Sequence, residues 1–86
     1  MNLNYENNVD MLHYYINEVI ERKGLAGPRC EKFIDAAYEI RGAMLDGLEQ
    51  SDLPALISDI RSDKQYWGLD AELSVLQEMM TGGASN

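Results

Sequence analysis

Apolar residues recur at intervals of three and four along almost the whole of this 86-residue chain, and this spacing constrains the fold more than any other feature. Because an α-helix has about 3.6 residues per turn, such spacing gathers apolar side chains on one face of a helix. The first example runs from Val9 through Leu12 and Ile16 to Ile20. A strand would instead require sustained alternation of apolar and polar residues, which the sequence lacks. The pattern therefore predicts an all-α fold.

Glycine, proline and capping residues divide this pattern into separate helical segments. The first predicted helix begins at Val9 and stops at Gly24, and the second begins at Pro28 and stops at Gly47. The third is capped by Ser51 or Asp52, and the fourth begins at Asp70 and stops at Gly82. Asn7 or Asn8 is expected to cap the first helix, and Pro28 fits the first turn of the second, where its missing N–H costs nothing. The third helix either ends near Ser62 or continues to Trp67.

The second predicted helix has an unusual glycine in its interior. Its buried stripe is expected to contain Cys30, Phe33, Ile34, Ala37, Ile40, Arg41 by its stem, Met44 and Leu45. Gly42 lies inside this stripe and costs about 1 kcal/mol relative to alanine. Either the helix ends there, or a neighbouring helix crosses closely over it; Gly47 is the expected end.

The connectors between these amphipathic helices are short, which favours antiparallel neighbours. A chain of this length forms one domain at most, and its composition, 45% hydrophobic and 26% charged, is that of a globular protein. We therefore predict a single helical domain over residues 1–86, a small antiparallel bundle of three to four amphipathic helices. Residues 1–7 and 82–86 are expected to be flexible ends.

Acidic residues outnumber basic ones by fifteen to seven, which gives a net charge of −8. Such a charge disfavours direct binding to nucleic acid and to anionic membranes, since both depend on Lys and Arg. The N-terminal residues have no signal-peptide pattern, and no apolar run approaches the roughly 20 residues of a membrane span. The lone Cys30 fits a reducing compartment. We therefore expect a cytoplasmic protein that binds neither nucleic acid nor membrane.

Seven of the acidic residues form two rows with helical spacing. The rows are Glu31, Asp35, Glu39 and Asp46 in the second predicted helix, and Asp52, Asp59 and Asp63 in and around the third. One interpretation is a solvated face that keeps the protein soluble, with Lys32 paired to Asp35. The other is a docking surface for a basic protein, because carboxylates one turn apart lie about 5–6 Å from each other, close to the phosphate spacing of a nucleic-acid strand.

The aromatic residues are the second group of candidate binding residues. They are Tyr14, Tyr15, Tyr38, Tyr66 and Trp67. Tyr14 and Tyr15 are adjacent and point about 100° apart on a helix, so one of them must leave the core. Exposed Tyr and Trp rings are favoured at protein interfaces. The five rings are therefore either partner-binding anchors or a cover for the rim of the bundle.

No catalytic, cofactor or metal motif stands out in the sequence. His13 is the only histidine and is expected on the inner face of the first helix, in a structural role. Cys30 lies within an apolar stripe, where a free thiol behaves as a small hydrophobic group. One His and one Cys are too few for a usual metal site. We expect no enzymatic activity, no cofactor and no metal; an enzyme or metal protein using His13, Cys30 and nearby acids is the weaker alternative.

Charge and aromatics together predict a small acidic, helical protein-binding module. In composition and helicity the chain resembles acidic nucleic-acid-mimicking inhibitors and bacteriocin immunity proteins, which phages and plasmids often encode. This resemblance of class implies a blocker that occupies a basic, nucleic-acid-binding surface of a partner protein. The alternative is a homo-oligomeric structural or adaptor bundle, such as a homodimer, whose acidic surface provides only solubility. Its seam would contain Tyr66, Trp67, Leu76, Met79 and Met80.

Overall fold

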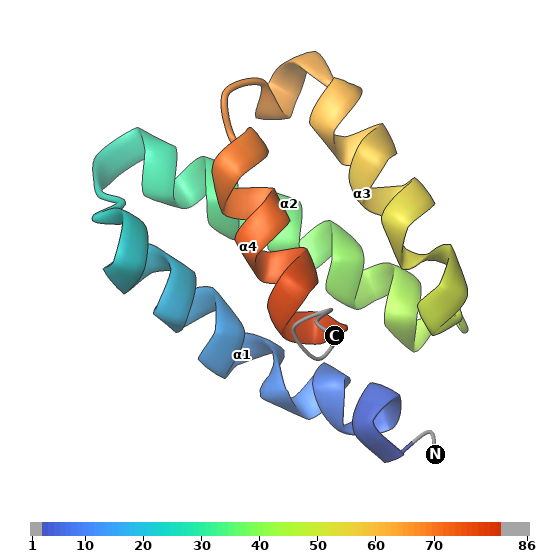
Figure 1. The fold of residues 1–86 in the computed structure, drawn as a ribbon. Coiled ribbons are helices and arrows are strands. Elements are labelled where there is room, and N and C mark those ends of the chain that lie inside the picture. Colours follow the sequence, from blue (N-terminus) through green and yellow to red (C-terminus); the bar gives the residue numbers. More distant parts are fainter. Residues whose placement is uncertain (1–2, 82–86) are drawn as a thin grey trace.

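Four α-helices follow one another in the computed structural model, which describes residues 3–81 and the side chains of residues 11–49 and 51–81. The helices are α1 (Leu3–Lys23), α2 (Gly27–Leu45), α3 (Leu53–Ser62) and α4 (Asp70–Met80) (Figure 1). Two short 3₁₀ turns, η1 (Gln50–Asp52) and η2 (Lys64–Tyr66), flank α3. Residues 3–81 contain no strand, so the predicted all-α class is confirmed.

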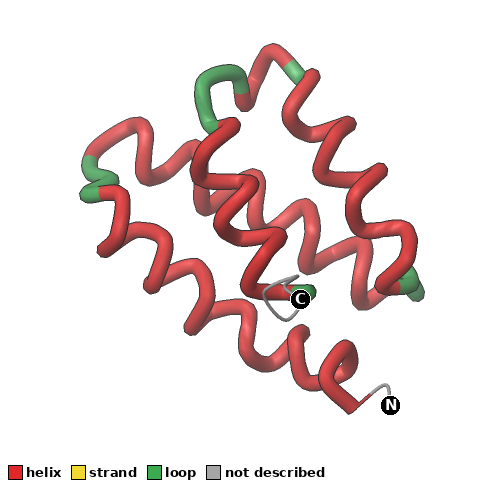
Figure 2. The backbone as a smooth tube through the Cα atoms, viewed as in Figure 1, coloured by secondary structure: helices red, strands yellow, loops and turns green. Residues whose placement is uncertain are grey.

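Successive helices run in opposite directions, with short loops at alternating ends of the bundle (Figure 2). α1 packs against both α2 and α4, and α3 packs against α4 and α2. In Figure 1, α4 lies in front of α2, with α1 and α3 to either side. The principal extents are 37 × 23 × 23 Å. The predicted small antiparallel bundle is therefore the observed architecture.

One apolar core joins all four helices. Its most deeply buried side chains are Leu12, Val19, Phe33, Ala36, Ala37, Ile40, Leu53, Ile57, Leu69, Leu73 and Leu76. The predicted stripe of α4 is confirmed, because Leu69, Leu73 and Leu76 are fully buried and Met80 nearly so. Leu45 is 59% exposed, and its predicted burial is wrong. It lies about 100° around α2 from the buried Met44, which carries it past the last contact with the core.

The predicted start of the first helix is wrong. α1 begins at Leu3, so Asn7 and Asn8 lie inside it and do not cap it. Asparagine is a modest helix former, and a long helix continues through it at small cost. Of the two predicted flexible ends, residues 3–7 belong to α1, whereas residues 1–2 and 82–86 lie outside the described part of the chain.

α2 ends just before Gly47, as predicted, and α3 ends at Ser62, the first of the two predicted alternatives. Pro28 lies in the first turn of α2, and the chain leaves that helix through Gly47, whose φ of +108° favours glycine. α2 continues past Gly42 to Leu45, and no neighbouring helix crosses closely there, because a Cβ built on Gly42 would meet no atom of the described residues within 4 Å. Both explanations that the sequence suggests for Gly42 are therefore wrong.

Within residues 3–81 no helix combines the length and the apolar character that a membrane crossing would need.

Candidate functional site

All seven carboxylates of the two predicted acidic rows are exposed to solvent. On α2 the row of Glu31, Asp35 and Glu39 runs along the side opposite Phe33 and Ile40, whose side chains are fully buried. This arrangement follows from the sequence, because residues four apart lie one above the other on a helix. The expected exposure of both rows is confirmed.

The ion pairs of the protein use other acids. Among the side chains that the structure describes, Arg22 pairs with Glu18 at 3.7 Å, Arg29 with Glu72 at 2.9 Å, and Arg61 with Asp70 at 3.9 Å. None of the row carboxylates pairs with a described basic side chain. The negative charge of the rows is therefore not neutralised by the described part of the chain.

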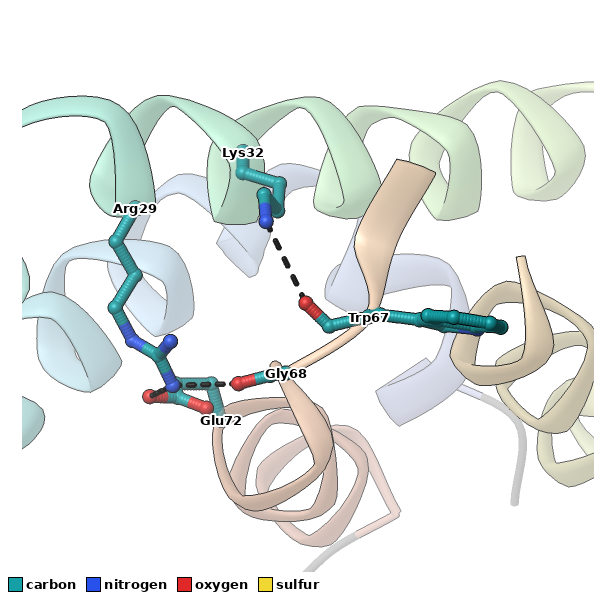
Figure 3. A network of polar contacts seen from close by, with 5 residues as sticks. All are labelled: Arg29, Lys32, Trp67, Gly68 and Glu72. Atoms are coloured by element: carbon teal, nitrogen blue, oxygen red, sulfur yellow. Dashed lines mark hydrogen bonds and ion pairs between the residues drawn. The ribbon is translucent and has the colours of Figure 1, made fainter. Parts of the chain in front are cut away.

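Arg29 and Lys32 of α2 bind the connector 67–69 between η2 and α4 (Figure 3). Arg29 Nη2 donates a hydrogen bond to the Gly68 carbonyl and another, of 2.9 Å, to Glu72 Oε2. Lys32 Nζ donates to the Trp67 carbonyl at 3.4 Å. The predicted pairing of Lys32 with Asp35 is thus wrong, since Lys32 is partly buried and turned toward the connector.

Glu72 is the buried partner in this network. This residue is 4% exposed and lies in the first turn of α4, where a negative charge is favoured by the helix dipole. Oε2 binds Arg29, whereas Oε1 has no hydrogen-bond partner among the described residues. The Arg29 side chain remains half exposed. The contact therefore closes the α2–α4 junction rather than presenting a charge to solvent.

Trp67 is the most exposed of the predicted aromatic anchors, at 58%. Its side chain points away from Arg29 and toward the chain that precedes it (Figure 3). The indole Nε1 donates to the Ser62 carbonyl at 3.1 Å. The two backbone contacts of residues 67 and 68 with α2, together with this bond, fix the ring at the surface.

Tyr66 is only 4% exposed, so its predicted role as an exposed anchor is wrong. Its hydroxyl donates a 3.0 Å hydrogen bond to Glu39 Oε2. Burial, this hydrogen bond and the nearby carboxylates of Glu39, Asp35 and Asp63 raise the pKa of Tyr66 to about 12. All of these effects disfavour the phenolate, so the hydroxyl remains a donor to Glu39 near neutral pH.

The two acidic rows approach each other around Tyr66. Glu39 and Asp35 come from α2, whereas Asp63 follows the last residue of α3. Asp63 Oδ1 also accepts a 2.9 Å hydrogen bond from the backbone N–H of Gln65 and thereby caps η2. Sequence reasoning missed both structural roles. An aspartate directly before a short helical turn is a known capping signal, but no local signal predicts the Tyr66–Glu39 contact.

The remaining aromatic anchors lie on α1 and α2. Tyr14 and Tyr38 are 56% and 49% exposed, while Tyr15 is partly buried against the core. The ring centroids of Tyr14 and Tyr15 are 6.0 Å apart, and the two ring planes form an angle of 65°. This agrees with the prediction that adjacent tyrosines diverge, one toward solvent and one toward the core.

His13 is exposed, so its predicted place on the inner face of α1 is wrong. It lies about 100° around α1 from the buried Leu12, at the edge that faces α2. There its ring meets Tyr38 edge-on, with centroids 6.0 Å apart. Cys30 is partly buried against the core, as predicted. Among the described residues no group of three or more His, Cys, Asp or Glu side chains could hold a metal ion.

The predicted homodimer seam is largely used inside the monomer. Leu76, Met80 and Tyr66 are 0%, 2% and 4% exposed, so these three cannot also line a surface between subunits. Met79 is partly buried against the same core, which leaves Trp67 as the exposed member of the set. The reason is that α4 packs against both α1 and α3, which cover its apolar stripe.

No protein family, curated protein sequence or solved structure matches this chain in comparisons of sequence and fold.

Proposed function

We propose that this protein is a small acidic binding module that occupies a basic surface of a partner protein, as an inhibitor or immunity-type blocker. The observation that carries the proposal is the solvent exposure of seven carboxylates in two rows, none of which pairs with a described basic side chain, although Glu39 and Asp63 also accept hydrogen bonds within the protein. A protein that needed acids only for solubility could distribute them among its basic residues at lower electrostatic cost.

Several basic residues are engaged in contacts within the protein and do not offset the exposed acids. Arg29, Lys32 and Arg61 direct their charge into contacts with the α3–α4 region, and Arg22 pairs along α1. Much of the positive charge is therefore turned inward or already paired. The net charge of −8 therefore favours encounter with a positive partner surface, and the exposed, unpaired acids of α2 are available to meet it.

Exposed aromatic rings supply the second requirement of a binding surface. Tyr14, Tyr38 and Trp67 are each about half exposed or more, between 49% and 58%. Rigid rings of this kind bury large areas at low entropic cost when a partner arrives. A basic groove built for nucleic acid offers both positive charge for the carboxylates and surfaces on which bases, or rings, can stack. A nucleic-acid-binding protein of the cytoplasm is accordingly the proposed target.

The test is affinity capture from native lysate at about 0.1 M and about 1 M salt, where the Debye length is ~10 Å and ~3 Å. Three baits are compared: the wild type, Glu31→Gln/Asp35→Asn, and the matched control Glu21→Gln/Glu78→Gln. The control removes the same charge from exposed acids of α1 and α4. We expect a basic protein that the wild type and the control retain at low salt and that the α2 variant loses.

Equal recovery of that partner by all three baits would show that the row on α2 is only a solvated face. Recovery that does not change between low and high salt would likewise remove the electrostatic basis of the proposal, because screened charges cannot hold a surface complex together.

A further inference from the structure

The outer face of α2 contains exposed apolar residues among its acids. This face consists of Glu31, Asp35, Tyr38, Gly42, Leu45 and Asp46. Tyr38 and Leu45 are 49% and 59% exposed, and they are seven residues apart, so they lie on the same side of the helix. Gly42 lies between them in the same stripe. The spacing i, i+4, i+7 is the one by which helices recognise other helices.

Gly42 has no explanation within the described part of the molecule. Its backbone is helical and its φ is not positive, so the conformation does not require glycine. An added Cβ would meet nothing within 4 Å, so internal packing does not require it either. Glycine in a helix interior nevertheless destabilises the helix relative to alanine. A glycine between two larger side chains leaves a low point where a second backbone or side chain can approach closely.

The surroundings of this low point determine the charge of what could fit it. Glu31, Asp35 and Asp46 border the stripe and are all exposed, whereas Arg41, the basic residue next to Gly42, is only partly exposed. Asp46 also follows the last residue of α2, where the helix dipole is already negative. A second copy of this chain, with its own charge of −8, would bring like charges together across such a contact. The complementary occupant is positively charged.

We infer that the outer face of α2 is a docking surface for an amphipathic, basic helix of the partner. An apolar side chain of that helix seats at Gly42 between Tyr38 and Leu45, and Lys or Arg residues beside it meet Glu31, Asp35 and Asp46. The inference rests on the proposed function and deepens it, since it names the kind of element that the basic partner presents.

The probes for the test are two synthetic 18-residue helical peptides with the same leucine stripe, one bordered by lysine and the other by glutamate. Each peptide is titrated into the isotope-labelled protein, and backbone amide shifts are followed. We expect the lysine peptide to shift amides of α2 around residues 38–46 and the glutamate peptide to cause no saturable shift.

Gly42→Leu fills the low point and should weaken binding of the lysine peptide at least tenfold. The matched control is Ala55→Leu, which adds the same side chain at an exposed position of α3 and should leave the affinity unchanged. Gly42→Ala serves as a second variant that cannot distort the helix. Thermal unfolding followed by circular dichroism verifies that each variant is folded.

Three results would overturn the inference. In the first, the lysine peptide does not bind the folded wild type. In the second, it binds the Gly42→Leu variant as tightly as the Ala55→Leu control, but binds the Glu31→Gln/Asp35→Asn variant more weakly. In the second case the acidic surface of the proposed function stands and only the helix-docking site falls. A wild type that dimerises in sedimentation, and that Gly42→Leu makes monomeric, would instead make a second copy the occupant. Failure of the proposed function is recognised separately: the wild type and the Glu31→Gln/Asp35→Asn bait would then recover the same partner in equal amounts from lysate.

Discussion

The two long sides of α2 use charged residues in opposite ways. On the side that faces the connector 67–69, Arg29 and Lys32 bind backbone carbonyls, and Glu39 accepts a hydrogen bond from Tyr66. On the outer face, Glu31 and Asp35 have no ion pair with a described side chain. Residues with the same helical spacing therefore either stabilise the fold or stay exposed and unpaired, according to what packs beside them.

If the connector side is structural, Arg29→Ala should destabilise the protein more than any substitution on the outer face. Breaking a buried ion pair from one side costs about 3–5 kcal/mol, and we expect about 2–3 kcal/mol because Arg29 is half exposed. Urea unfolding provides the measurement. The matched control is Arg22→Ala, which removes an exposed pair within α1 and should cost less than about 0.5 kcal/mol. Equal stability of the two variants would contradict a structural role for the Arg29–Glu72 contact.

Tyr66 provides a pH test of the same side. Because its pKa is raised to about 12 from the ordinary value of 10.0, the folded state favours the neutral phenol. The stability that this raised pKa gives the folded state is fully present below pH 10 and is lost as the pH rises toward 12. One pKa unit corresponds to about 1.4 kcal/mol, so the total loss is at most about 2–3 kcal/mol. Tyr66→Phe should lose about 1 kcal/mol at pH 7 and should lack this alkaline decrease.

The measurement for Tyr66 is the urea midpoint at about pH 7, 10 and 11, a range that brackets the ordinary tyrosine pKa. All other ionisable groups are common to the two proteins, so the difference between wild type and variant isolates the phenol. The exposed Tyr14→Phe is the control and should keep the wild-type pH dependence. An alkaline decrease of the same size in Tyr66→Phe would mean that the Glu39 contact does not bias the ionisation.

On the outer face, Gly42→Ala should change stability in the favourable direction. We expect a gain of about 1 kcal/mol, because the position is helical and exposed and an added Cβ meets no neighbour. Gly47→Ala is the control with the opposite sign, since φ at that position is +108° and a side chain there is strained. Thermal unfolding measures both variants. A destabilised Gly42→Ala protein would indicate that the helix needs glycine there for its own packing, which would contradict a docking role for this residue.

The smallest effect is expected from the acidic row itself. Glu31→Gln/Asp35→Asn removes a like-charge pair one turn apart and should stabilise the protein by about 0.2–0.5 kcal/mol at low salt. The gain should diminish in about 1 M salt. Thermal unfolding at both salt concentrations measures it. A loss of stability would show that these carboxylates, like Glu39, have structural partners.

Periodicity was sufficient to predict the helices and most of the core. The stripe of α4 follows from Leu69, Leu73 and Leu76 alone, and the exposure of the acidic rows follows from their place opposite Phe33 and Ile40. A helical wheel gives the angle of each side chain around its own axis. It does not say which neighbouring element covers that angle.

Several of the wrong predictions concern that second kind of information. Tyr66 is buried because η2 packs against α2, and its partner Glu39 is 27 residues away in sequence. His13 is exposed because the only described ring contact that α2 makes with it is the edge-on contact with Tyr38, which does not cover the imidazole. Lys32 turns from Asp35 toward a carbonyl of the connector. Each contact depends on the docking of distant segments, which no local pattern specifies.

The position of Trp67 decides how this protein can be observed in solution. The chain has a single tryptophan, and its indole is anchored to the Ser62 carbonyl yet open to water. Its fluorescence should therefore resemble that of the denatured polypeptide in emission wavelength, and a spectral shift will be a poor indicator of melting. A molecule that binds over the indole will exclude water from it and shift its emission to shorter wavelength. The fluorescence of Trp67 will therefore report binding at this part of the surface.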